Sequence, residues 1–153
     1  MTPEARQAFS HDLRQALGEA WRRLEQHYRT LINANGALTN RYHHLDLQNF
    51  FLDLNYQLRD QFQTYRKWEI YLVDEGVKEI KGEPLDSSNP ISSEVSAAGE
   101  SDGDIARWKE ILSVYCRIHA RMRLELRVWN DADFKEYEDA LSRLCPSGNE
   151  RVH

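Results

Sequence analysis

Glycine, proline and cysteine are scarce in this chain of 153 residues, which has only seven glycines, four prolines and two cysteines. An all-β protein needs many tight turns, and glycine and proline supply most of them. The scarcity of both therefore argues against a β fold. Two cysteines, Cys116 and Cys145, cannot form a network of several disulfides. We expect both thiols to be free, as in a protein of the reducing cytoplasm.

Long apolar runs are also missing. A membrane-spanning helix needs about 20 consecutive, mostly apolar residues, whereas the longest candidate, Phe-Phe-Leu at 50–52, is followed at once by Asp53. The first 15 residues contain no apolar segment of the kind found in a secretion signal. We therefore predict no association with a membrane and expect the cytoplasm as the location.

Acidic charge is concentrated in one segment. Residues 82–104 hold six of the 25 acidic residues and none of the 20 basic ones, so the rest of the chain is close to neutral. This balance does not predict a broad basic surface for nucleic acid. Because serine, proline, glycine and acids dominate residues 83–103, we predict a disordered acidic loop there. A flexible tail is predicted at residues 146–153.

A helical repeat of apolar residues is the strongest feature that the sequence does have. Between residues 3 and 35 apolar side chains recur every three or four positions, which predicts one amphipathic helix. The same spacing predicts a second helix that runs unbroken over residues 47–81 and a third that begins near Asp104. Basic residues give way to acidic ones near Trp129, so we predict a separate short helix over residues 131–144. A single bent helix is the alternative.

The predicted fold is therefore all-α, in a single domain over residues 1–153. Long amphipathic helices with short connections pack beside one another in alternating directions. We expect an elongated antiparallel bundle of three long helices and a short C-terminal helix, with coiled-coil-like contacts and an aromatic core. The apolar stripe of the third helix is predicted to contain Ile105, Trp108, Leu112, Tyr115, His119, Met122, Leu126 and Trp129.

Arginines gather on the third predicted helix. Residues 105–128 carry six basic and two acidic side chains. Guanidinium groups bind phosphates and carboxylates through paired hydrogen bonds, so this helix provides a candidate surface for a partner or a phosphate. Its members are Arg117, Arg121, Arg123, Arg127 and Trp129. The alternative interpretation is that these arginines pair with acids of neighbouring helices or of the acidic loop.

His119 stands where the helical period requires an apolar residue. One interpretation is a partly buried histidine that is hydrogen-bonded to a backbone carbonyl or a tyrosine. The other is a polar switch in the core that responds to pH or to a partner.

Groups of metal ligands are too small to predict a metal site. Cys116 and His119 lie three residues apart, and His43 and His44 lie near Asp46. Two ligands on one turn do not complete a zinc site. We predict no metal and no cofactor.

A ribonuclease of the HEPN type is a further hypothesis, because such enzymes are helical bundles that use an arginine and a histidine separated by four to six residues. Two pairs have that spacing, Arg6 with His11 and Arg22 with His27. With 15 arginines and six histidines, about two such pairs are expected by chance. The match therefore adds little support.

The sequence thus favours a non-enzymatic helical protein that binds other protein chains, as an adaptor, scaffold or regulatory subunit, and that forms a homo-oligomer. The argument is one of elimination, since no catalytic motif accompanies the long apolar stripes. The alternative is a nucleic-acid-associated protein or HEPN-like ribonuclease that uses the arginines of the third helix or an Arg–His pair.

Overall fold

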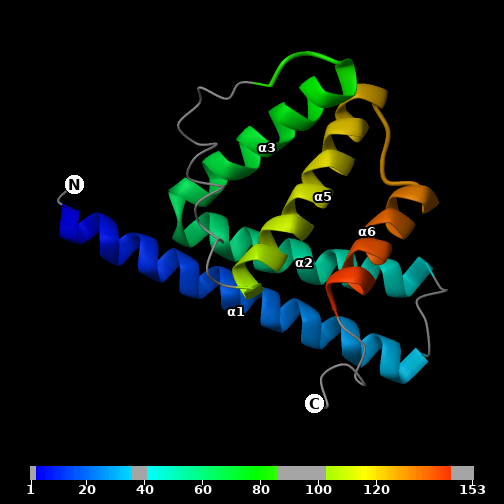
Figure 1. The fold of residues 1–153 in the computed structure, drawn as a ribbon. Coiled ribbons are helices and arrows are strands. Elements are labelled where there is room, and N and C mark those ends of the chain that lie inside the picture. Colours follow the sequence, from blue (N-terminus) through cyan, green and yellow to red (C-terminus); the bar gives the residue numbers. More distant parts are fainter. Residues whose placement is uncertain (1–2, 36–40, 86–102, 146–153) are drawn as a thin grey trace.

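The computed structural model describes residues 3–35, 41–85 and 103–145, and this part of the chain contains helices and no strands. The helices are α1 (Pro3–Asn35), α2 (Arg41–Gln61), α3 (Gln63–Lys81), α5 (Gly103–Glu125) and α6 (Asp131–Leu144) (Figure 1). The all-α prediction is confirmed, and so are the bounds predicted for the first and last helices. Most of the predicted acidic loop (86–102) and the predicted tail (146–153) lie outside the described residues.

The prediction of one unbroken helix over residues 47–81 is wrong. α2 ends at Gln61, Phe62 has an extended backbone (φ −132°, ψ 107°), and α3 begins at Gln63. No glycine or proline marks this break in the sequence. The Phe62 side chain is only 8% exposed, so the bend keeps the ring in the core. In Figure 1, α3 leaves the line of α2 and rises from it at a sharp angle.

α3 and α5 lie side by side and run in the same direction (Figure 1). Near their starts, the indole N–H of Trp108 donates a hydrogen bond of 3.2 Å to the Tyr65 hydroxyl. Near their ends, Asp74 of α3 pairs with Arg123 of α5 at 3.6 Å. The antiparallel order predicted for the long helices therefore does not hold for this pair, and the predicted count of three long helices is not established.

Aromatic side chains form the centre of the core. The ring of Phe51, on α2, contacts Trp108 and Tyr115 of α5 and Tyr137 of α6, with centroid separations of 5.1, 5.0 and 5.6 Å. Tilted and edge-on aromatic pairs at such distances stabilise beyond the burial of their area. These contacts fix α5 and α6 above α2. No helix in the described part of the chain is long and apolar enough to cross a membrane.

The C-terminal end of α3 is a turn that requires a left-handed residue. Gly82 has φ 73°, and the following N–H, that of Glu83, donates to the Lys78 carbonyl at 2.8 Å. This is the Schellman arrangement, which satisfies carbonyls at the helix end. Glycine adopts this conformation without steric cost because it has no Cβ.

The C-terminal end of α5 has the same geometry with a different residue. The Arg127 N–H donates to the Met122 carbonyl at 3.2 Å, and the left-handed residue is Leu126, with φ 54°. A left-handed residue with a Cβ costs roughly 1–2 kcal/mol. Because α5 ends at Glu125, Leu126 does not continue the predicted apolar stripe but is 91% exposed.

Substitutions in these two turns should have opposite effects on the free energy of unfolding. Leu126→Gly should raise it by about 0.5 kcal/mol, because the strain relieved exceeds the entropy that glycine adds to the unfolded chain. Gly82→Ala is the matched control and should lower it by about 1 kcal/mol, although no heavy atom of another residue lies within 4 Å of the added Cβ. Urea unfolding measures both. A Leu126→Gly variant less stable than the wild type would contradict this account.

Candidate functional site

Two arginines of the predicted patch are bound to α6. Arg121 lies 3.3 Å from a carboxylate oxygen of Asp133 and 2.5 Å from one of Glu136. Arg127 donates to the same Asp133 and to Glu125. Burial opposes the charged form of Asp133, but the hydrogen bonds from Arg127 and from the Asn130 backbone lower its pKa below the usual value. The alternative interpretation, in which the arginines pair with acids of neighbouring helices, describes both residues.

The other two arginines are more accessible. Arg123 pairs with Asp74 of α3, and both of these side chains are more than half exposed. Arg117 is exposed and forms no ion pair with any residue in the described part of the chain. Three of the four arginines thus have carboxylate partners, which reduces the positive charge available to a phosphate.

Trp129 does not share an exposed surface with the arginines. Its side chain is 5% exposed and packs against Tyr115, Phe134 and Tyr137, with centroid separations of 5.9, 5.2 and 5.7 Å. The residue therefore belongs to the core and does not offer its ring to a partner.

Side chains alternate inward and outward along the connection between α5 and α6. Arg127 is bound to the buried carboxylate of Asp133, and Trp129 is buried. Leu126, which precedes Arg127, is 91% exposed, and Val128, which lies between Arg127 and Trp129, is 76% exposed. The segment is thus held by its inward side chains while two apolar side chains face outward.

Two further apolar side chains lie at this end of the molecule. A Cβ added to Gly76 would lie 3.2 Å from the Cβ of Ala120, so these positions face each other across the parallel helices. Residues four positions further on lie on the same helix faces, and they are Ile80 and Leu124, which are 44% and 36% exposed. We call these four exposed residues near the C-terminal ends of α3 and α5, Ile80, Leu124, Leu126 and Val128, the apolar end.

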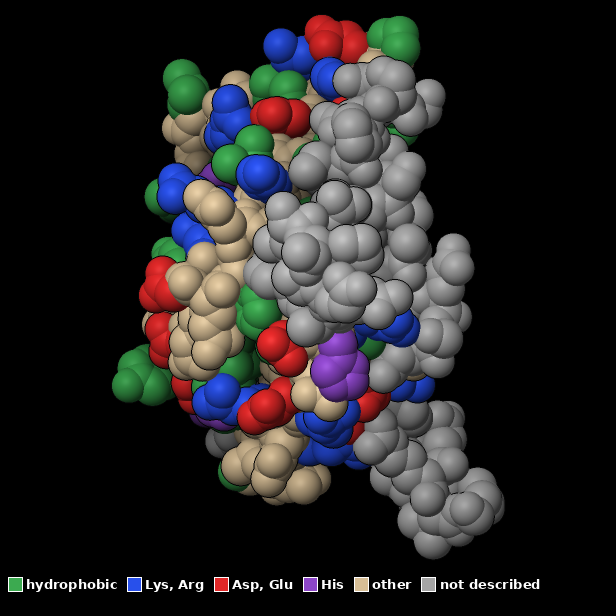
Figure 2. Space-filling view, turned by 90° about the vertical axis from the view of Figure 1, so that its left-hand side faces the viewer, with side chains coloured by type: hydrophobic (Ala, Val, Ile, Leu, Met, Phe, Trp, Pro, Cys, Tyr) green, Lys and Arg blue, Asp and Glu red, His purple; other side chains and the backbone are tan. Residues whose placement is uncertain are grey.

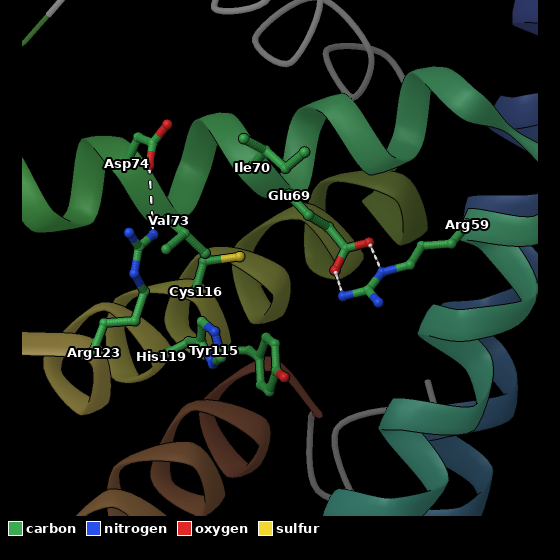
Figure 3. Close-up of a pocket in the computed structure, with 9 residues that line it drawn as sticks. All are labelled: Arg59, Glu69, Ile70, Val73, Asp74, Tyr115, Cys116, His119 and Arg123. Carbon is green, nitrogen blue, oxygen red and sulfur yellow. Dashed lines mark hydrogen bonds and ion pairs between the residues drawn. The ribbon is translucent and has the colours of Figure 1, made fainter. Parts of the chain in front are cut away.

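His119 lines a separate pocket of about 190 Å³ between the end of α2, α3 and α5 (Figure 3). Its ring stacks near that of Tyr115, with centroids 6.0 Å apart. Burial, and then the charges of Arg123 and Arg59, lower the pKa of His119. The pocket is lined by Arg59, Glu69, Ile70, Val73, Asp74, Tyr115, Cys116, His119 and Arg123.

The titratable groups of this pocket are poorly suited to nucleophilic chemistry. Burial raises the pKa of the Cys116 thiol well above its usual value, and a thiol must ionise to act as a nucleophile. Burial also raises the pKa of Tyr115 to about 12. In Figure 3 each arginine of the pocket is directed at a carboxylate, Arg59 at Glu69 and Arg123 at Asp74.

Glu69 is the centre of a buried network that the sequence analysis did not identify. Arg59 donates to both oxygens of the Glu69 carboxylate, at 2.7 and 2.9 Å. Asn55 donates to the same carboxylate at 2.7 Å and accepts from the Tyr65 hydroxyl. Tyr65 in turn accepts from Trp108. The network thus joins α2, α3 and α5 around the bend at Phe62.

A signal for this network was present in the sequence. Asn55 lies four residues after Phe51, and Glu69 four residues after Tyr65, so both polar residues follow the period of the apolar stripe. A buried carboxylate and a buried amide need hydrogen-bond partners. Glu69 and Asn55 are partners of each other, and Arg59 is a second partner of Glu69.

Among the described residues, the structure does not bring together the Arg–His pairs or the possible metal ligands considered in the sequence analysis. Arg22 pairs with Asp104 at 3.0 Å, while His27 stacks on Phe50 with centroids 4.0 Å apart. The Arg6 side chain lies outside the described part of the structure, and His11 is exposed. Within the described residues, no three histidine, cysteine or acidic side chains gather where they could hold a metal ion.

Replacement of Glu69 should be far more costly than replacement of Asp74. Glu69→Gln should lower the free energy of unfolding by about 2 kcal/mol, because it leaves Arg59 and Asn55 without their buried carboxylate. Asp74→Asn removes an ion pair between two exposed side chains and should cost less than about 0.5 kcal/mol. Chemical denaturation compares the two variants. Equal losses would show that the network does not stabilise the bend.

Replacement of His119 should show whether this residue is only structural. His119→Leu should then raise the melting temperature by about 2 °C, the shift given by somewhat less than 1 kcal/mol in a protein of this size. The folded state lowers the pKa of His119, so the unfolded state binds the proton first as the pH falls below 6.5, the ordinary pKa of histidine.

The wild type should therefore lose stability relative to His119→Leu as the pH falls below 6.5. Thermal unfolding at a series of pH values measures this difference. Parallel curves for the two proteins would contradict the lowered pKa, and a lower melting temperature of the variant would contradict a purely structural role.

Comparison with known proteins assigns the chain to no family. No family model matches it, and no curated protein and no solved structure is significantly similar to it.

Proposed function

We propose that this chain is a non-enzymatic protein that binds other protein chains, as an adaptor, scaffold or regulatory subunit. The observation that carries this proposal is the apolar end. Single exposed apolar residues are common on protein surfaces, but here Leu126 and Val128, on either side of Arg127, are 91% and 76% exposed, and Ile80 and Leu124 near the ends of α3 and α5 are exposed as well. Contiguous exposed apolar side chains are typical of interaction sites.

The apolar end is presented by a fixed segment. Arg127 is bound to Asp133 and Glu125, and Trp129 is buried, so the backbone that carries Leu126 and Val128 is anchored on both sides. A preorganised binding segment loses less conformational entropy when a partner binds. This supports a role in recognition.

The identity of residue 126 gives separate support. Glycine would suit the left-handed turn at the end of α5 better than leucine, as Gly82 does at the end of α3. The exposed Leu126 side chain adds little to the core, because it is almost fully accessible to solvent. A contact made outside this chain accounts for a leucine at this position.

The alternative, nucleic-acid binding through the arginines, has weaker support. A phosphate would have to displace the carboxylates that hold Arg121 and Arg127. Arg117 alone among the four has no ion pair within the part of the chain that the structure describes. One guanidinium that lacks a carboxylate partner among the described residues supplies little of the electrostatic attraction on which phosphate-backbone binding depends.

Photocrosslinking tests the proposal directly. A photoreactive amino acid replaces Val128 in cells that produce the protein, and the matched control replaces Tyr42, which is also 76% exposed but lies at the start of α2. We expect protein adducts from position 128 that exceed those from position 42 several-fold and that decline with Leu126→Ser. No adduct with any protein at position 128, or equal yields at both positions, would overturn the proposed function.

A further inference from the structure

We infer that the pocket around His119 binds a small monocarboxylate, whose carboxylate group lies against the imidazole between the two ion pairs of the pocket. The pocket shares no residue with the apolar end, so this site is independent of the proposed function. The size of the pocket, its unused hydrogen-bonding groups and its charges favour this class of ligand.

The pocket has room for one ring and one polar substituent. Its volume is about 190 Å³, and a cavity of about 150 Å³ is large enough to enclose a benzene ring. Drug-sized ligands need roughly 300 Å³ or more. Ile70, which is more than half exposed, and the half-buried Val73 provide an apolar wall on α3. The ligand is therefore a small molecule with an apolar body of about one ring.

Two side chains of the pocket have hydrogen-bonding capacity that the fold does not use. The imidazole of His119 and the hydroxyl of Tyr115 belong to half-buried residues, and neither group has a hydrogen-bond partner among the described residues. Because burial raises the pKa of Tyr115 to about 12, its hydroxyl keeps its proton and can donate. A ligand that accepts hydrogen bonds provides a partner for both groups.

The two ion pairs of the pocket differ in strength. In Figure 3 the Arg59–Glu69 pair and the Arg123–Asp74 pair lie on opposite sides of the pocket, with His119 between them. Arg59 donates to both oxygens of its carboxylate. Arg123 lies 3.6 Å from its carboxylate, which is longer than a hydrogen bond, and both side chains of this pair are more than half exposed. Arg123 can therefore turn towards a ligand at small cost.

The electrostatic potential at His119 is positive. Burial, then Arg123 and then Arg59 lower the pKa of His119, and Glu69, which raises it, acts more weakly than either arginine. A carboxylate bound at this point opposes these effects and raises the pKa of His119, so binding takes up a proton. The titratable and charged side chains that line the pocket with His119 are Arg59 of α2, Glu69 and Asp74 of α3, and Tyr115, Cys116 and Arg123 of α5.

The overall charge of the pocket favours a single carboxylate over a polyanion. On the face that Figure 2 shows, basic and acidic side chains of the described residues are interspersed and do not gather into a field of one sign. Two arginines and two carboxylates of the pocket likewise sum to zero. Such surroundings give little attraction to a polyanion. A carboxylate that binds together with a proton on His119 adds no net charge.

Titration of the purified full chain with benzoate tests the inference, and benzamide, a neutral molecule of the same shape, is the control ligand. We expect a dissociation constant for benzoate on the order of 1 mM near pH 6, and about tenfold weaker binding near pH 7.5. The reason is that the carboxylate pairs with the imidazolium form of His119, whose population falls as the pH rises. Benzamide should bind at least tenfold more weakly near pH 6 and without this pH dependence.

Nuclear magnetic resonance of the histidine side chains shows where benzoate binds. The chain contains six histidines. Saturating benzoate should raise the pKa of His119 and leave the titration of the other histidines unchanged, which excludes general binding to the surface.

Variants test the residues that hold the carboxylate. His119→Leu should weaken benzoate binding at least tenfold near pH 6 and remove its pH dependence, with unchanged helix content by circular dichroism. Arg123→Gln should weaken binding about fivefold and provides a second test if His119→Leu fails to fold. Arg117→Gln is the matched control, because Arg117 is an exposed arginine of the same helix outside this pocket, and it should bind like the wild type.

The inference would be overturned by the absence of benzoate binding up to about 50 mM near pH 6, or by equal affinities for benzoate and benzamide. An unchanged pKa of His119 at saturation would overturn it as well. So would binding that neither His119→Leu nor Arg123→Gln weakens relative to Arg117→Gln. None of these results bears on the proposed function, which the photocrosslinks from position 128 test separately.

Discussion

The carboxylate of Glu69 is the interaction on which the arrangement of helices depends. It lies on α3 but binds Arg59 and Asn55 of α2, across a connection of one extended residue. Removing a carboxylate from water costs several kcal/mol unless it is paired and hydrogen-bonded, so only bend geometries that bring these three side chains together are favourable. Tyr65 extends the network to Trp108 of α5 and thereby fixes the third helix.

The surface proposed for recognition is a consequence of this bend. After the bend, α3 runs beside α5 in the same direction, so the C-terminal ends of the two helices lie together (Figure 1). Two aligned helix C-termini place partial negative charges side by side, and Lys78, Lys81 and Arg123 in the last turns offset them. The connection to α6 then leaves without regular secondary structure and exposes Leu126 and Val128.

Much of the secondary structure could be predicted from the sequence because apolar side chains recur with the helical period. The change from basic to acidic residues located the start of α6 at Asp131, where Asn130 and Asp133 form a capping box. The same change in charge underlies the ion pairs of Arg121 and Arg127 with Asp133. The helical period therefore predicted where helices form. The change in charge predicted the start of α6 and the pairing of arginines with acids of a neighbouring helix.

The bend and the apolar end could not be predicted in this way. At Phe62 no local residue opposes a helix. The period places Asn55 and Glu69 on the buried stripe but does not reveal that they and Arg59 bind one another across a bend. Leu126 and Trp129 continued the helical spacing on paper, but the helix ends at Glu125 and the next residues alternate inward and outward with a period of two. Both errors arise where tertiary contacts override a repeat that is formally intact.

The bend at Phe62 can be measured directly as the distance between spin labels on the exposed positions Asp53 of α2 and Glu79 of α3. Two helical arms of roughly 14 and 26 Å that meet at a right angle or more sharply place the labelled backbones about 30 Å apart or less. One unbroken helix between the same positions would separate them by about 39 Å. The shorter distance is the predicted result, and a distance near 39 Å would contradict the bend, the parallel pairing of α3 with α5, and the apolar end that both create.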